Sequence, residues 1–100
     1  MTTATEVPSV LFIEGELNIY RAAEVKDSLL GALVLSQSLE VDLAGVTELD
    51  SAGVQVLMLA KNTARAMQRE LHLCAHSPVV VEVFELLNLA SFFGDPLVIS

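Results

Sequence analysis

The strongest constraint on the fold comes from residues 41–57, which read VDLAGVTELDSAGVQVL. Apolar residues alternate up to Leu43, Gly45 interrupts the pattern, and a helical pattern opens with Asp50-Ser51-Ala52-Gly53. The segment therefore predicts a strand, a loop and the start of a helix. Ser51 places a hydroxyl at a helix N-terminus, where free backbone N–H groups can bind an oxyanion or a phosphate.

The remainder of the chain predicts short strands and helices. Strands are expected at residues 10–13, 16–19, 39–43, 71–75 and 97–99, and helices at 20–35, 52–67 and 78–87. The first two strands are expected to pair as a hairpin, whereas strands joined through helices usually pair in parallel. The order β-β-α-β-α-β-α-β predicts one α/β domain over residues 9–100, with a mixed sheet and helices packed against it, after a flexible N-terminus at residues 1–8.

The charge of the chain limits its partners. Lys and Arg number 5 against 13 Asp and Glu, and the formal net charge is -8. Nucleic acid and anionic membranes require clustered cations, so we expect a protein partner with a basic patch instead. No apolar run approaches the roughly 20 residues that cross a membrane, and no signal-peptide pattern is present, so a cytoplasmic protein without direct membrane insertion is expected.

The single cysteine, Cys74, lies in an alternating apolar segment and is interpreted as a small strand residue rather than a catalytic thiol. No metal site or cofactor is predicted.

A helical wheel of residues 51–69, drawn at about 100° per residue, separates two faces. The face expected to be buried carries Gly53, Val56, Leu57, Ala60, Ala64 and Met67. The face expected to be exposed carries Ser51, Gln55, Lys61, Asn62, Arg65 and Arg69, together with the apolar Val54 and Met58. Val54 and Met58 predict a small adhesive patch beside Ser51, although single exposed apolar residues are also common. Arg65 and Arg69 are interpreted as complements to the helix dipole.

Three interpretations of Ser51 follow from the residues alone. Ser51 or Asp50 can be the helix N-cap, which contributes about 1 kcal/mol. Ser51 can be a nucleophile, but no G-x-S-x-G motif surrounds it, and the only candidate histidine bases are His72 and His76. Ser51 can be a phosphoacceptor, because a phosphate adds about -1.5 to -2 charge beside Glu48 and Asp50 and would repel a docked partner.

Three features together resemble the STAS domain of bacterial anti-sigma factor antagonists. They are GELN at residues 15–18, VDLAGVTELDSAG at residues 41–53, and the amphipathic helix that follows. The resemblance extends from about Ser9 to Ile99. It implies a non-enzymatic domain that binds an anti-sigma factor, itself a serine kinase, and is released from it when Ser51 is phosphorylated. A PP2C-type phosphatase would restore the unmodified form.

The resemblance and the predicted patch together give a partner-binding surface. It comprises Thr47, Glu48, Asp50, Ser51, Val54, Gln55, Met58 and Asn62. Asn18 departs from the family pattern, which often has Asp there, and so removes a negative charge near the site. Related stand-alone domains are subunits of lipid-transport ABC complexes or act in chemosensory or two-component pathways, and this is the alternative function. The ABC subunit often has Thr at the motif, so Ser51 favours the phosphorylation switch. The oligomeric state stays open.

Overall fold

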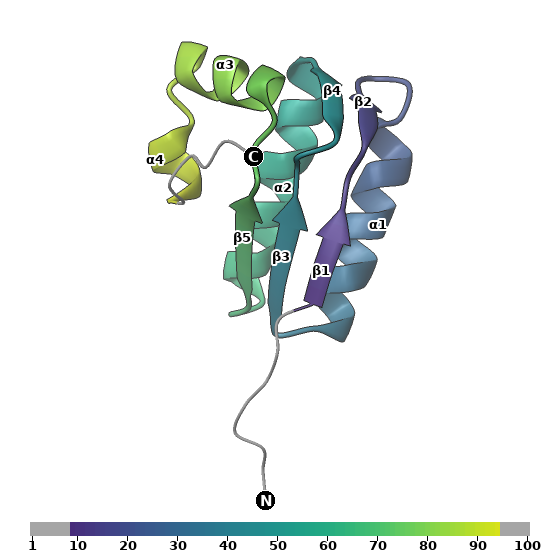
Figure 1. Ribbon diagram of the computed structural model, residues 1–100. Coiled ribbons are helices and arrows are strands. Elements are labelled where there is room, and N and C mark those ends of the chain that lie inside the picture. Colours follow the sequence, from purple (N-terminus) through teal and green to yellow (C-terminus); the bar gives the residue numbers. More distant parts are fainter. Residues whose placement is uncertain (1–8, 95–100) are drawn as a thin grey trace, which may run out of the picture.

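The computed structural model describes residues 9–94, which fold into alternating strands and helices (Figure 1). The elements are β1 (Ser9–Phe12), β2 (Gly15–Leu17), α1 (Ala22–Leu35), β3 (Ser38–Asp42), β4 (Val46–Leu49), α2 (Ser51–Ala66), β5 (Glu70–Cys74), α3 (Pro78–Leu86) and α4 (Ala90–Phe93). The predicted α/β class is confirmed, and the three longer helices lie within two residues of their expected limits. The predicted N-terminal segment 1–8 and the predicted strand 97–99 lie outside the described residues.

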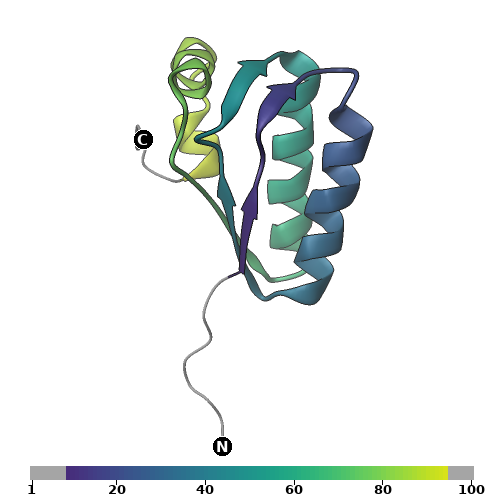
Figure 2. The ribbon, with the colours of Figure 1, turned by 45° about the vertical axis from the view of Figure 1, so that its right-hand side comes forward.

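The strands form two parallel groups. β3 is the centre of a three-stranded sheet in the order β1-β3-β5, and β2 pairs with β4. α1 and α2 lie side by side on one face of these strands, whereas α3 and α4 lie toward the other side (Figure 2). Every strand pair in the described part of the chain is parallel, as expected for strands joined through helices.

The predicted hairpin of the first two strands is wrong. β1 pairs with β3, and β2 continues in the same direction to pair with β4. Backbone hydrogen bonds from Ile13 to Asp42 (3.1 Å) and from Gly15 to Gly45 (2.8 Å) carry this pairing across the junction. Gly15 has a positive φ of 83° and the register shifts after it, so it bends one extended segment and does not reverse the chain.

Much of the core lies between the strands and the pair α1 and α2, and buried residues of α3 and α4 such as Phe84 and Phe93 join it. Alternate residues of β3 and β5 are buried on this face, as period-two strands require. Helical residues from α1 and α2 complete the core; the buried residues of these four elements include Val25, Leu29, Leu33, Leu39, Val41, Leu57, Ala60, Ala64, Leu71 and Leu73. None of the helices within residues 9–94 is long and apolar enough to cross a membrane.

β4 was expected to be a loop. Its four residues, Val46–Leu49, bury only the first and last side chain, so no apolar alternation marks them as a strand. β2 and β4 end at the same end of the molecule and lead into α1 and α2 (Figure 1). This arrangement brings the segment after β2 next to the segment that contains Ser51.

Candidate functional site

Ser51 is the first residue of α2, and its side chain is exposed. The preceding Asp50 has an extended backbone, and its Oδ1 accepts a hydrogen bond from the Gly53 N–H at 3.0 Å. Asp50 is therefore the N-cap, and the capping interpretation applies to it rather than to Ser51. The Ser51 hydroxyl stays accessible at the helix N-terminus.

Gly53 allows the first turn of α2 to lie directly against β2. A Cβ atom at this position would lie 2.5 Å from the Leu17 carbonyl oxygen and 2.8 Å from the Leu49 Cδ1 atom. Both separations are too short for non-bonded atoms, so packing requires the glycine of the Asp-Ser-Ala-Gly sequence. The close approach fixes the helix N-terminus and, with it, the position of Ser51.

Asp50 also holds the connection between β2 and α1. Its Oδ2 accepts a hydrogen bond from the Ile19 N–H at 3.1 Å, and its own N–H donates to the Leu17 carbonyl oxygen at 3.3 Å. Within the connection, Asn18 Oδ1 accepts from the Tyr20 N–H at 3.0 Å, which is a local Asx turn. Asn18 is buried, and its amide stabilises this loop.

Ile19 and Tyr20 form an exposed apolar pair beside the start of α2. Their exposed fractions are 66% and 92%, and the hydrogen bond from Ile19 to Asp50 holds them close to Ser51. The sequence pattern predicts a strand end and a helix start at these two residues and gives no indication of a site there. The available signal was two consecutive large apolar residues between a polar Asn18 and the helical pattern.

The prediction that Val54 lies on an exposed face is wrong for the single chain, because only 5% of Val54 is exposed. Lys61 lies two turns later on the same side of α2, and its Nζ donates to the Leu71 carbonyl oxygen of β5 at 2.6 Å. At the position of Lys61, this side of α2 therefore faces β5 and not solvent. Lys61 is itself buried, contrary to the wheel, and Met58 is half-buried against the core.

The exposed side of α2 carries Ser51, Gln55, Leu59 and Asn62, which we call the α2 stripe. Three of these residues were predicted, and the fourth, Leu59, supplies an exposed apolar side chain (43%) in place of Val54. Thr47 and Glu48 of β4 are also exposed, as the predicted surface requires. The accessible candidate site is therefore the α2 stripe, Thr47, Glu48 and the pair Ile19 and Tyr20.

The charge around Ser51 is acidic. Glu48 lies opposite Glu16 in the pairing of β2 with β4, and both side chains are exposed. The nearby cation, Arg21, is already engaged: its Nη1 donates to the carbonyl oxygens of Glu14 and Glu16, both at 2.7 Å. A negative group added to Ser51 would therefore meet like charges and the partial positive charge of the helix N-terminus.

The nucleophile interpretation of Ser51 gains no support from the two histidines. His76 is 1% exposed and packs edge-on against Phe84, with ring centroids 5.7 Å apart. His72 lies within β5, with its Nε2 3.6 Å from a carboxylate oxygen of Glu70. His76 is therefore a core residue, and His72 has a carboxylate neighbour of its own.

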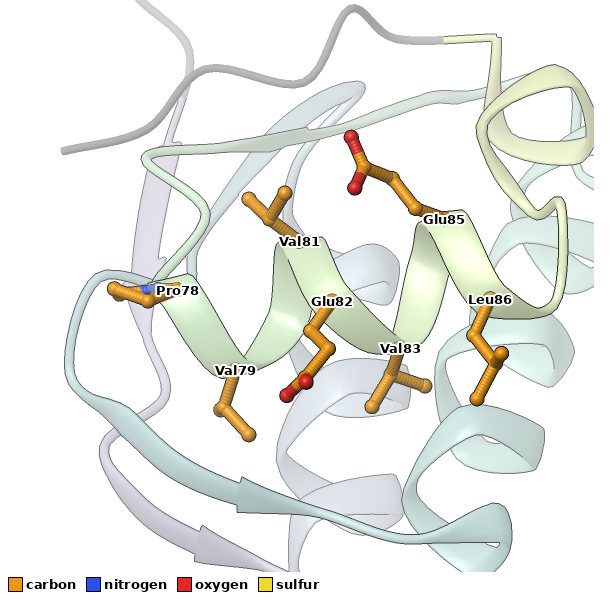
Figure 3. Close-up of a pocket in the computed structure, with 7 residues that line it drawn as sticks. All are labelled: Pro78, Val79, Val81, Glu82, Val83, Glu85 and Leu86. Carbon is orange, nitrogen blue, oxygen red and sulfur yellow. The ribbon is translucent and has the colours of Figure 1, made fainter.

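A surface hollow runs along α3 (Figure 3). Val79, Glu82, Val83 and Leu86 point to one side of this helix, and Val81 and Glu85 point to another. The hollow is lined by Pro78, Val79, Val81, Glu82, Val83, Glu85 and Leu86, none of which belongs to the predicted site. It is an open, mixed apolar and acidic surface.

The parallel strands, the two helices on one face and the capped helix start with an exposed serine define a small α/β domain of the STAS type. The chain belongs to the STAS family, because it matches a family model described as "Mlab, STAS domain" over residues 1–98. A comparison with curated proteins finds no match.

Solved structures share the fold. The unphosphorylated form of the anti-sigma factor antagonist SpoIIAA has a TM-score of 0.71 at 20% identity, with 95% of this chain and 84% of that chain covered. A candidate anti-sigma factor antagonist from Thermotoga maritima has a TM-score of 0.75 at 21% identity, with 91% and 81% covered. The phosphorylated form of SpoIIAA, a cell fate determinant of Bacillus, has a TM-score of 0.66 at 18% identity, with 95% and 87% covered.

Proposed function

We propose that this chain is a partner-switching regulator of the anti-sigma factor antagonist type. Its unmodified form binds an anti-sigma factor that is also a serine kinase, and phosphorylation of Ser51 ends the binding. A PP2C-type phosphatase reverses the modification. The domain acts by binding and not by catalysis, in keeping with a family that is generally non-enzymatic.

The observation that carries this proposal is the exposed hydroxyl of Ser51 beside the exposed Ile19 and Tyr20. A kinase can reach the hydroxyl without unfolding the chain, because Asp50 and not Ser51 caps α2. The neighbouring apolar side chains give a partner surface to bury, and large aromatic residues contribute strongly to protein interfaces.

A phosphate on Ser51 would change the surface without breaking the fold. It adds about -1.5 to -2 charge, which is repelled by Glu48 and Asp50 and would have to be desolvated against the apolar partner surface that covers Ile19 and Tyr20. The helix N-terminus offsets part of the repulsion, by about 0.3 to 1 kcal/mol at an exposed position. Both Asp50 oxygens already accept hydrogen bonds from the backbone, so the cap of α2 is retained.

The partner is expected to carry cations opposite the acidic residues. Glu16 and Glu48 are exposed next to the site, and the chain has a net charge of -8. Opposite charges at the rim of an interface accelerate association and select the partner. A basic rim around an apolar pocket for Ile19 and Tyr20 is the partner surface that fits best.

The alternative function is a docked subunit of a lipid-transport ABC complex or a component of a chemosensory or two-component pathway. One feature of Asn18 favours this alternative. Its neutral amide is buried in the loop turn, at a position where the resemblance implies a carboxylate near the site. In that case the same surface would bind its partner without a phosphorylation step.

Incubation with ATP and a candidate anti-sigma factor kinase from the same genome tests the proposal. Mass spectrometry should find one phosphate on Ser51, none in Ser51→Ala, and unchanged labelling in Ser28→Ala, which removes an exposed hydroxyl from α1. Phosphate on another residue, or none, would contradict the proposal. Stable co-purification with an ABC ATPase subunit, without phosphorylation, would favour the alternative.

A further inference from the structure

A basic pocket lies at the end of α2 opposite to Ser51. It is enclosed by the last turns of α2, the start of β5 and the segment at α4, and its volume is about 330 Å³. Its lining includes Lys61, Arg65 and Arg69, which are three of the five Lys and Arg residues of the chain. The chain as a whole carries 13 acidic residues, so its positive charge is concentrated at this pocket.

Lys61 is the buried member of this group. Its side chain is 9% exposed, and its Nζ donates one hydrogen bond to the Leu71 carbonyl oxygen at 2.6 Å. An ammonium group has three donors, and a carbonyl group supplies no negative charge. Within residues 9–94, no carboxylate lies within 4.0 Å of this Nζ. A buried cation without an anion costs free energy, and an anionic ligand would remove that cost.

Arg65 and Arg69 extend the positive surface toward solvent. Arg65 Nη2 donates to the Phe92 carbonyl oxygen at 2.9 Å, and its guanidinium lies 5.2 Å from the centre of the Phe92 ring. This contact fixes the guanidinium at the pocket and uses one of its five donors. Arg69 is half-buried, and no carboxylate of the described residues lies within 4.0 Å of it.

Glu70 is the one acidic residue among the described residues that line the pocket. Its carboxylate lies 3.6 Å from His72 Nε2. Within residues 9–94 it forms no ion pair with Lys61, Arg65 or Arg69. The dipole interpretation of Arg65 and Arg69 explains why cations are favourable near this helix end. It does not explain why Lys61 is buried there or why the three side chains line one cavity.

We propose that this pocket binds a small phosphate-bearing anion, with Lys61, Arg65 and Arg69 as its donors. The volume lies at the lower end of the range for small-molecule sites, about 300 to 1,000 Å³, which fits a phosphate or a phosphorylated small molecule. Charge-assisted hydrogen bonds from these groups to phosphate oxygens supply the specificity. The pocket is separate from the Ser51 site, since Arg65 lies 14 residues along α2 from Ser51, roughly 20 Å at 1.5 Å per residue.

Titration with inorganic pyrophosphate at constant ionic strength, followed by NMR of the backbone amides, tests the proposal. Shifts should saturate and should concentrate at residues 61–71 and at Gly94. Arg69→Gln should weaken binding at least about fivefold, because one charge-assisted contact is lost. Lys26→Gln, which removes an exposed lysine from α1, should leave binding unchanged. Non-saturating shifts, or equal effects of the two variants, would overturn the proposal.

A second arm distinguishes a soluble ligand from a lipid headgroup. Vesicles of phosphatidylglycerol and of phosphatidylcholine are compared in sedimentation assays with the parent chain and Arg69→Gln. Selective binding of the parent to the anionic vesicles would identify a lipid headgroup as the phosphate source. Binding of pyrophosphate without binding of vesicles would identify a soluble ligand. If neither probe binds the parent chain, the pocket is not an anion site.

Discussion

The Asp50 carboxylate accepts a hydrogen bond from the Ile19 N–H at 3.1 Å and so joins two segments that lie 31 residues apart in the sequence. Its other oxygen caps α2 through the Gly53 N–H. One side chain thus fixes the start of the helix that carries Ser51 and the loop that carries the exposed Ile19 and Tyr20. The candidate site depends on this double contact.

Asp50→Ala should therefore lower the free energy of unfolding by about 1 to 3 kcal/mol, since it removes a helix cap and a second hydrogen bond. Urea denaturation measures the change, and the Ile19 amide should exchange faster with solvent. Asp27→Ala removes an exposed carboxylate from α1 and is the matched control. Equal stability of the two variants would mean that the Asp50 contacts do not hold the site together.

Gly53→Ala should destabilise the fold by about 2 kcal/mol or more, because its Cβ would meet the Leu17 carbonyl oxygen at 2.5 Å. Gly31→Ala provides a contrast within α1, where a Cβ meets no atom within 4 Å. That variant should be neutral or more stable by up to about 1 kcal/mol, as expected for a helix interior. Thermal unfolding distinguishes the two, and similar melting temperatures would refute the close contact of α2 with β2.

Val54→Ala should lower the free energy of unfolding by about 1 to 2 kcal/mol, because two buried methyl groups are lost. Leu59→Ala should change stability by less than about 0.5 kcal/mol, since Leu59 is exposed on the α2 stripe. Chemical denaturation of the two variants tests which side of α2 faces the core. A larger effect at Leu59 than at Val54 would contradict the burial of Val54 and the exposure of Leu59.

Replacement of Ile19 and Tyr20 by Ser should weaken partner binding at least about tenfold, a loss of about 1.4 kcal/mol or more, with little change in stability. Leu35→Ser is the control, because Leu35 is 86% exposed at the far end of α1. Binding to the same candidate kinase is measured by calorimetry. Undiminished affinity of the double variant would exclude this pair from the interface.

Periodicity accounted for the helices and for β3 and β5, since each has a clear apolar pattern. It failed where elements were short. Val46–Leu49 buries its first and last residues and shows no apolar alternation. A glycine between two short apolar segments is typical of a hairpin turn, but Gly15 only bends the chain. In both cases the pairing partner, and not the local sequence, determines the strand.

Only part of the candidate site could be predicted, because contacts between distant segments decide which side chains belong to it. A helical wheel gives the relative directions of side chains, but it does not show which neighbours cover each flank, so the burial of Val54 was missed. The pair Ile19 and Tyr20 joins the site only through the hydrogen bond to Asp50. A contact across 31 residues leaves no local pattern.

The affinity of the chain for the proposed kinase partner, before and after phosphorylation of Ser51, tests the central claim most directly. Phosphorylation, and to a smaller extent Ser51→Asp, should weaken binding at least about tenfold while the melting temperature stays nearly unchanged. Ser51→Ala should bind as the parent does and should not respond to ATP. Equal affinity of the phosphorylated and unmodified chains would contradict the charge switch at Ser51.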